Sequence, residues 1–350
     1  MTSIDESKDY AVQVFNSSPE MVKHWEKVLD QYPDLLKNDR WIVDPSPIAF
    51  SDGKTITRKN ARKDGMFMPI DKGRSSVIYR AWDVETNEYV AVKFVSIMDD
   101  LPWPRPQAHT DNLKLWELEI DALSKINHSN VVRLIGGTSG WMNNCLFPVI
   151  VMEYIHGQNF DRILVEDLFS TEMKKEVMDK IAQAIDFCNS QGIIHRDIKP
   201  LNILIEEKDN RPVLIDFGTT NLHKMRGYIL PGTLGYMSVN QYLNKKPRLS
   251  DDVWGYCCSL SHVFLETTPF KLGQEEGDDY FKGYNNILTH KYNDFDIDLL
   301  KHSFPKISKE KIYAFFDSFF DPDIGMGKRR GPKSCKEAFE LFMKFLQEVS

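Results

Sequence analysis

The segment HRDIKPLN at residues 195–202 decides the fold of this chain. It places a histidine, an arginine, an aspartate and a lysine within five positions, directly before two strand-like runs separated by a Lys-Asp-Asn turn. Such a pattern predicts a hairpin over residues 202–215, which returns the chain to the sequence DFG at 216–218. We therefore expect Asn202 and Asp216 to be neighbours in space although they lie 14 positions apart.

The polar groups around this hairpin suit phosphate chemistry. Asn202 and Asp216 offer oxygen ligands of the kind that Mg²⁺ takes beside substrate phosphates. Asp197 can accept the proton of a hydroxyl group or orient that hydroxyl. Lys199 supplies positive charge where a transferring phosphoryl group develops negative charge.

These residues match the signature H-R-D-x-K-x-x-N followed by D-F-G, and from about residue 67 the chain resembles the eukaryotic-type protein kinase family. The resemblance implies an α+β, bilobal fold with a small strand-rich N-lobe, one main helix in that lobe, and a larger helical C-lobe. It also implies ATP and Mg²⁺ as cofactors, Asp197 as the catalytic base, Lys199 as a catalytic residue, and Asn202 and Asp216 as the metal ligands. The competing interpretation is a set of polar turn caps in an unrelated α/β fold.

A valine-rich run at residues 88–97 carries Lys93 between apolar neighbours. A lysine in the middle of such a strand needs an anionic partner. The resemblance supplies two partners, the α/β-phosphates of ATP and a glutamate on the following helix, which we expect at about 111–126. Glu119 has apolar neighbours at helical spacing, whereas Glu117 has the pattern of a solvated charge. Glu119 is therefore the expected partner and, like Lys93, a candidate catalytic residue.

The same resemblance, taken residue by residue, implies the nucleotide site. Gly73 is the one surviving glycine of the family's Gly-rich loop and permits a close approach of the backbone to the phosphates. The backbone of Glu153 and Ile155 would bind the edge of the base, and Leu204 would lie beneath it. The implied cofactor-binding set is Ile70, Gly73, Ile78, Ala91, Lys93, Met152, Glu153, Ile155 and Leu204.

The segment GTLGYM at 232–237 resembles the end of the family's activation segment, where peptide substrates dock. Its Thr233, together with Lys199, indicates serine or threonine rather than tyrosine as the acceptor, and the resemblance implies that Thr233 is a catalytic residue. Regulated family members often carry a Ser or Thr three positions before the G-T pair, where this chain has Ile229. We expect activity that does not depend on phosphorylation there, with Tyr228 as the nearest alternative acceptor.

Asn240 departs from the family pattern because it stands where the glutamate of the A-P-E triplet is expected. It cannot form the usual buried ion pair with a later arginine, for which Arg329 or Arg330 is the candidate. We expect lowered local stability rather than lost chemistry. Asp251 is expected to cap or charge the first turn of the following helix, and Asp252 to bond the backbone of the catalytic loop.

Composition limits the class of protein and indicates how the chain is divided into regions. The chain has 350 residues and a formal net charge of −7, which excludes a global basic footprint for nucleic acid. We expect an N-terminal extension of unknown role at 1–65 and a kinase domain at 66–350, divided into an N-lobe, 66–155, and a C-lobe, 156–350. Five scattered cysteines and the absence of a signal or membrane-span pattern favour a cytoplasmic, reducing compartment.

The sequence therefore predicts an ATP- and Mg²⁺-dependent serine/threonine kinase that transfers the γ-phosphate to protein hydroxyls. Its expected partner is a protein substrate, with no nucleic acid and no membrane span. A regulatory partner that binds through residues 1–65 is left open. Asp161, Glu166 and Asp167 either favour basic substrates or form a solvated face. The alternatives are a nucleotide-binding pseudokinase scaffold with weak or no turnover and a small-molecule phosphotransferase on a related fold.

Overall fold

The chain forms two compact units in the computed structural model. Unit 1 comprises Met1–Ser124 with Val132–Ile155, and unit 2 comprises Lys125–Val131 with His156–Ser350. The structure describes residues 41–43, 48–49, 55–56, 70–72, 76–83, 85–95, 106–142, 145–220, 232–270, 285–289, 291–320 and 331–350. No helix in these ranges is both long and apolar enough to cross a membrane.

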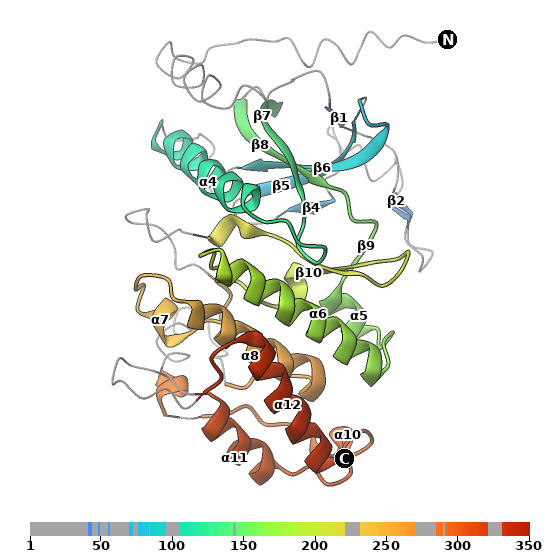
Figure 1. The fold of residues 1–350 in the computed structure, drawn as a ribbon, viewed down its shortest axis with the longest axis vertical. Helices are drawn as coiled ribbons and strands as arrows, with labels where there is room; N and C mark the ends of the chain where they lie inside the picture. Colours follow the sequence, from blue (N-terminus) through green and yellow to red (C-terminus); the bar gives the residue numbers. More distant parts are fainter. Residues whose placement is uncertain are drawn as a thin grey trace. The chain divides into compact units, whose positions relative to one another are not determined.

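Unit 1 is built on an antiparallel sheet whose strands run in the order β1-β5-β6-β8-β7, with β4 also paired to β5 (Figure 1). A separate pair, β2 with β3, lies outside it. The strands are β1 (Trp41–Val43), β2 (Ile48–Ala49), β3 (Thr55–Ile56), β4 (Asp71–Lys72), β5 (Ser76–Asp83), β6 (Glu88–Val95), β7 (Leu134–Met142) and β8 (Cys145–Glu153).

Alternation along β6 divides its side chains between two faces. The buried core on one face combines its valines and phenylalanine with residues of the neighbouring strands. That cluster consists of Ala81, Val90, Val92, Phe94, Val149 and Val151. Lys93 belongs to the opposite face, and it is nevertheless only 3% exposed. The burial of this lysine calls for a counter-charge from another element.

Helix α4 (Pro106–Ser124) supplies that element and packs against the sheet of unit 1. It begins about five residues before the predicted start because proline is favourable in the first turn, where its missing N–H is not needed. Gly137 on β7 allows the close approach, since an added Cβ would lie 2.4 Å from Ile120 Cδ1 and 2.9 Å from Trp116 Cζ2. The Trp116 indole also donates to the Val149 carbonyl at 2.9 Å, which fixes the rotation of the helix.

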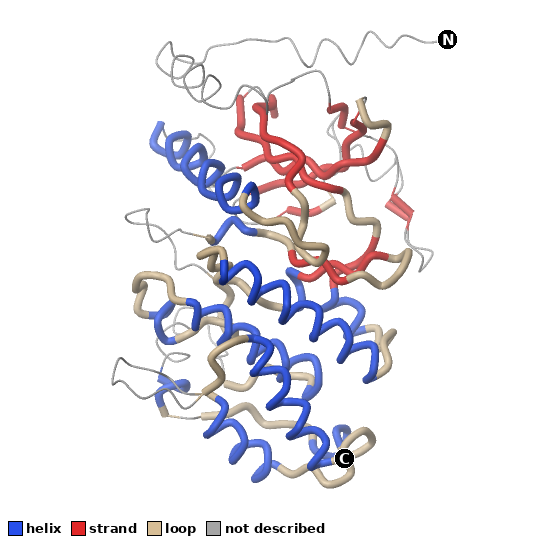
Figure 2. The backbone as a smooth tube through the Cα atoms, in the orientation of Figure 1, coloured by secondary structure: helices blue, strands red, loops and turns tan. Residues whose placement is uncertain are grey.

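Unit 2 begins with a small antiparallel sheet in the order β11-β10-β9. Its strands, β9 (Gly157–Asn159), β10 (Ile203–Glu206) and β11 (Pro212–Leu214), are drawn in red among the helices of Figure 2. Gly157 is required where β9 meets β10, because an added Cβ would lie 1.9 Å from the Ile205 carbonyl oxygen. Two 3₁₀ turns flank the hairpin, η2 (Pro200–Asn202) and η3 (Phe217–Thr219).

The rest of unit 2 is helical, with α6, α8 and α12 packed against one another (Figure 1). Nearly every residue of α8 is buried, so this helix is apolar around most of its circumference and forms the centre of the unit. The helices are α5 (Phe160–Val165), α6 (Thr171–Ser190), α7 (Val239–Tyr242), α8 (Leu249–Leu265), α10 (Ile297–Leu300), α11 (Lys309–Phe319) and α12 (Cys335–Val349).

Aromatic rings join α11 to α12, as expected for ordinary helix packing. Phe315 stacks on Phe345 with ring centroids 4.3 Å apart. The four cysteines whose side chains the structure describes are buried and form no disulfide: Cys188, Cys257, Cys258 and Cys335. Burial raises the pKa of the Cys188 thiol to about 12, so this side chain is an inert packing group.

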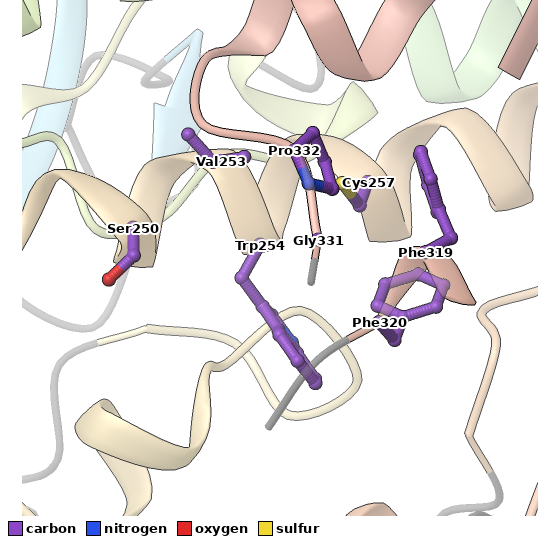
Figure 3. A pocket seen from close by; sticks show the side chains of 8 residues that line it. All are labelled: Ser250, Val253, Trp254, Cys257, Phe319, Phe320, Gly331 and Pro332. Atoms are coloured by element: carbon purple, nitrogen blue, oxygen red, sulfur yellow. The ribbon is translucent and has the colours of Figure 1, made fainter. Parts of the chain in front are cut away.

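A pocket of about 30 Å³ opens beside α8 (Figure 3). Its lining includes Trp254, which stacks on Phe270 with ring planes 6° apart. The volume corresponds to roughly one water molecule. It cannot hold a nucleotide, and the candidate site is therefore defined by polar side chains elsewhere in the unit.

Candidate active site

The loop after α6 is anchored to the first turn of α8. Both oxygens of the buried Asp252 carboxylate accept backbone N–H groups, from His195 at 2.8 Å and from Arg196 at 2.7 Å. Burial raises the pKa of Asp252 to about 7, while the two N–H groups act to lower it. Arg196 itself has a left-handed backbone with φ of 70°. Such a conformation costs roughly 1–3 kcal/mol and persists where the surroundings enforce it.

His195 links this loop to the hairpin that follows. Its Nε2 lies 2.9 Å from the Ile215 carbonyl oxygen, and its Nδ1 accepts the Asp197 backbone N–H at 3.2 Å. The geometry requires the neutral tautomer with the proton on Nε2. Burial lowers the pKa of His195, which acts in the same direction. The imidazole also packs edge-on against Phe217, with ring centroids 4.7 Å apart.

The Asp197 carboxylate is held by three side-chain donors. Thr233 Oγ1 donates to Oδ1 at 2.8 Å, while Lys199 Nζ and Asn202 Nδ2 lie 2.7 and 2.9 Å from Oδ2. Lys199 Nζ also lies 2.5 Å from Thr233 Oγ1, so the lysine joins both residues. The Asp197 side chain is only 8% exposed. One carboxylate is thus fixed in direction beside a positive charge, an arrangement that can orient a hydroxyl group and accept its proton.

Asn202 and Asp216 stand at the two ends of the hairpin, and the Ile215 backbone N–H donates to the Asn202 carbonyl at 3.0 Å. Asp216 has a left-handed backbone with φ of 64° and is half-buried. Magnesium in phosphoryl-transfer sites takes one or two protein oxygens together with phosphates and waters, so this pair is a suitable donor set. The described residues contain no group of three or more His, Cys, Asp or Glu side chains that could hold a metal ion. A metal at this pair would therefore also need phosphate or water ligands.

The segment that begins at Gly232 packs against the backbone of the catalytic loop at Arg196. Gly232 has φ of 118°, and an added Cβ would lie 3.0 Å from the Arg196 carbonyl oxygen. The same carbonyl accepts a 2.7 Å hydrogen bond from Gln241 Nε2. Gln241 in turn forms a capping box with Ser238 at the start of α7. These contacts fix the position of Thr233 beside Asp197.

Asp251 has a larger role than the expected helix cap. Its carboxylate does accept the Arg248 N–H at 3.1 Å, as a first-turn residue of α8 should. It is also buried, however, and receives hydrogen bonds from Ser238 Oγ at 2.7 Å and from Asn240 Nδ2 at 3.0 Å. Asn240 thus hydrogen-bonds within this network. Arg329 and Arg330 lie outside the described residues.

In unit 1, Lys93 forms an ion pair with Glu119. Lys93 Nζ lies 2.7 Å from Oε1 and 3.0 Å from Oε2, and both side chains are at most 4% exposed. Glu117 instead pairs with Lys114 at the surface of α4. The inward face of α4 therefore carries the carboxylate that balances the buried lysine.

Other candidate nucleotide-binding residues of unit 1 are adjacent across the sheet. Ile78 is opposite Lys93, and Ala91 is opposite Met152. The Ile70 N–H donates to the Ile78 carbonyl at 2.8 Å. Glu153 ends β8, and Ile155 follows it as a buried residue. Leu204 lies on β10 in unit 2, and Gly73, Tyr228 and Ile229 lie outside the described residues.

Several contacts at the site were not predicted from the sequence. Thr219 Oγ1 donates to the His195 carbonyl at 2.5 Å, and Gln241 binds the next carbonyl of the loop. A hydroxyl directly after DFG and a glutamine three residues after Ser238 were the available signals. Two of the three acidic residues considered for basic substrates have partners of their own, since Glu166 pairs with Arg162 and Asp167 lies 3.5 Å from Lys174.

Comparison with solved structures supports the fold. A structure of Rad53, residues 1–466, in complex with AMP-PNP matches 79% of this chain and 63% of that one with a TM-score of 0.55 and 23% identity. This match, together with the strand-rich and helical units, confirms the predicted α+β kinase-like fold.

Curated relatives are similar over part of their length. A probable myosin light chain kinase of Dictyostelium discoideum is 31% identical over 53% of this chain and 39% of its own length. A probable serine/threonine-protein kinase of the same organism is 27% identical over 71% of this chain and 39% of its own. Wall-associated receptor kinase-like 5 of Arabidopsis thaliana is 31% identical over 59% and 28%. The chain thus spans well under half the length of these relatives.

The family comparison covers most of the chain. The model of the protein kinase domain matches residues 67–338, a range that contains every candidate site residue named above. With the catalytic-loop geometry described, this match confirms the resemblance drawn from the HRDIKPLN and DFG segments. The chain belongs to the protein kinase family.

Proposed function

We propose that this chain is an ATP- and Mg²⁺-dependent serine/threonine protein kinase in which Asp197 acts as the catalytic base. The observation that carries the proposal is the Asp197 carboxylate, held by Thr233, Lys199 and Asn202 at 2.7–2.9 Å. An acceptor hydroxyl placed at this carboxylate is oriented for attack on a phosphoryl group.

The transfer step follows from these positions. The acceptor oxygen forms a bond to the γ-phosphorus as the bond between that phosphorus and the oxygen of ADP breaks, and the hydroxyl proton passes to Asp197. Lys199 lies 2.7 Å from Asp197 and supplies positive charge as negative charge grows on the transferring group. Thr233 holds Asp197 in the direction of the acceptor.

Nucleotide binding is assigned to the residues predicted from the sequence. Lys93, oriented by Glu119, binds the α/β-phosphates, while Ile70, Ile78, Ala91, Met152 and Leu204 provide the apolar surface for the base. The backbone of Glu153 and Ile155 is assigned to the edge of the base, and Gly73, on the sequence resemblance alone, to the phosphates. Asn202 and Asp216 would hold Mg²⁺, which would supply positive charge to neutralise the phosphates.

The assignment of serine and threonine as acceptors rests on Lys199 and Thr233 beside Asp197. Relatives described as serine/threonine-protein kinases support it. The alternative, a pseudokinase scaffold, has less support because Lys93, Glu119, Asp197, Asn202 and Asp216 are all present.

The test is transfer of labelled γ-phosphate from ATP with Mg²⁺ to a generic basic protein and to the chain itself. Asp197→Asn keeps the size of the side chain and removes the base, and Asp209→Asn, an exposed carboxylate in the β10–β11 turn, is the matched control. We expect phosphoserine or phosphothreonine with wild type and the control, and a loss of about 10²-fold or more with Asp197→Asn. Equal labelling by wild type and Asp197→Asn would overturn the proposal in favour of the scaffold.

A further inference from the structure

Arg196, the residue before the candidate base, has a completely buried side chain in unit 2. Both Arg196 and Asp251 have side chains that are 0% exposed, and Arg196 Nε lies 3.8 Å from Asp251 Oδ2. The guanidinium nitrogens make no hydrogen bond within the described part of the chain. The nearest full counter-charge is therefore the Asp251 carboxylate.

The Asp251 carboxylate accepts hydrogen bonds from two segments of the chain. Ser238 Oγ and Asn240 Nδ2 come from the start of α7, and the Arg248 N–H comes from the residue before α8. Its partners are thus two neutral side chains, one backbone group and one guanidinium. A carboxylate held in this way cannot turn toward solvent, and it stays next to Arg196.

Arg196 needs such an anion because burial disfavours its charge. Burial lowers the pKa of its guanidinium, and the charges of Asp251 and Asp252 oppose that effect. Asp252 already accepts the backbone N–H groups of His195 and Arg196. Asp251 is consequently the carboxylate that remains to balance the positive charge of the Arg196 side chain. A buried guanidinium without a counter-ion is far less favourable than a paired one.

The position of Arg196 bears directly on the candidate base. Its left-handed backbone, with φ of 70°, sets the direction in which the chain continues into Asp197. Its carbonyl is held by Gln241 and its N–H by Asp252. A shift of the Arg196 side chain would strain both contacts and turn the Asp197 carboxylate away from Thr233.

We propose that Asp251 is a positioning residue, a permanent internal counter-ion that holds Arg196 and thereby sets Asp197, so that the catalytic loop reaches its working geometry without a phosphate group on a neighbouring segment. The inference rests on the proposed kinase function and adds how that function is regulated. A phosphate brought to Arg196 would meet the carboxylates of Asp251 and Asp252.

The experiment is a double-mutant cycle on the full chain with Asp251→Asn, Arg196→Met and the combination. Each protein is treated with phosphatase until intact mass shows no phosphate, and kcat and peptide KM are then measured from initial rates. Asp298→Asn, an exposed carboxylate on α10, is the matched control, and Tyr228→Phe removes the nearest hydroxyl before the G-T pair. Thermal unfolding of every variant is recorded in parallel.

We expect wild type without phosphate to keep its kcat within twofold of the phosphorylated sample, with Tyr228→Phe and the control unchanged. Asp251→Asn should lower kcat at least tenfold with peptide KM within threefold, because positioning rather than binding is lost. The double variant should be no slower than the slower single variant. A kcat that collapses on phosphatase treatment, a normal kcat for Asp251→Asn, or losses that multiply in the double variant would overturn the inference.

Failure of the inference and failure of the proposed function give different results. If wild type transfers no phosphate, the kinase proposal fails, and the counter-ion is then judged by thermal unfolding alone. Non-additive shifts of Arg196→Met and Asp251→Asn support the pair, whereas additive shifts refute it. If Asp251→Asn does not fold, the double variant, which lacks both buried charges, still tests the pair against Arg196→Met.

Discussion

Thr233 Oγ1 donates a 2.8 Å hydrogen bond to Asp197 Oδ1 across 36 positions of sequence. Lys199 joins the same two residues, at 2.7 Å from the carboxylate and 2.5 Å from the hydroxyl. The segment that follows Gly232 and the catalytic loop therefore meet at one carboxylate. The Thr233 hydroxyl donates to the side chain of Asp197 and not to the backbone. Loss of this hydroxyl should therefore change catalysis more than stability.

Replacing Thr233 by valine keeps the shape of the side chain and removes the hydroxyl. A hydrogen bond to a charged group contributes about 1.5–3 kcal/mol, so kcat should fall roughly tenfold to hundredfold. Thr233→Ser keeps the donor and should stay close to wild type. Steady-state phosphate transfer to a peptide measures both, and a valine variant as fast as the serine variant would contradict the role given to the hydroxyl.

The Lys93–Glu119 pair should be sensitive to loss of either partner. Glu119→Gln removes the carboxylate that pairs with the buried Lys93, and breaking a buried pair costs about 3–5 kcal/mol. We expect a lower unfolding temperature and a higher KM for ATP. Glu117→Gln is the control on the same helix, because its surface pair with Lys114 is worth about 1 kcal/mol or less. Equal unfolding temperatures for the two variants would refute the assignment.

Asn240→Asp should destabilise unit 2 although it changes only one group. The amide nitrogen lies 3.0 and 3.1 Å from the two Asp251 oxygens, so the substitution replaces a hydrogen bond by two carboxylates in contact. We expect a loss of about 2 kcal/mol or more at pH 7.5, with partial recovery near pH 5 as the pair takes up a proton. Urea unfolding at both pH values measures it, with the exposed Asn127→Asp as control. A loss that does not depend on pH would argue against repulsion.

His195 should make the protein acid-sensitive. Its folded pKa is lowered by burial, and its Nδ1 accepts the Asp197 N–H, so the native state keeps the neutral ring. In the unfolded chain a histidine takes up a proton near its ordinary pKa of about 6.5, so the unfolding free energy should fall as pH drops below that value. The slope from this group is at most about 1.4 kcal/mol per pH unit.

The check on His195 is the pH dependence of unfolding from pH 7.5 to 5.5 in wild type and His195→Gln. Groups such as His262, whose pKa is also lowered by burial, titrate in both proteins and cancel in the comparison. The variant should be less stable at pH 7.5 and should lose less on acidification. Parallel curves would show that His195 does not contribute the expected proton uptake.

Much of the fold was predictable because its signals are local. The helix expected at about 111–126 is observed as α4, Pro106–Ser124. The hairpin after the catalytic loop follows from the Lys-Asp-Asn turn, and it brings Asn202 beside Ile215. Strand β7 was harder, since Gly136 and Gly137 carry no strand signal. Gly137 is favoured there because Trp116 and Ile120 of α4 occupy the space that a side chain would need.

The role of Asp251 could not be predicted from the sequence, because it depends on contacts between distant segments. Two acids at the start of a helix have the same local pattern, and both fit a helix cap. The sequence predicted that Asp252 bonds the backbone of the loop, as it does, but only the fold shows that Asp251 lies against Arg196, Ser238 and Asn240. The departure at Asn240 is then physically consistent, since a glutamate there would face a buried carboxylate.

The pairing of β1 with β5 has a consequence for how this protein can be shortened. Trp41–Val43 covers the backbone of residues 81–83, yet the family match begins at residue 67. A fragment cut at the family boundary would keep its catalytic loop but leave part of the outer edge of β5 without a partner. Unprotected strand edges recruit strands from other molecules. Self-association of such a fragment would reflect the missing edge strand and not a native oligomer.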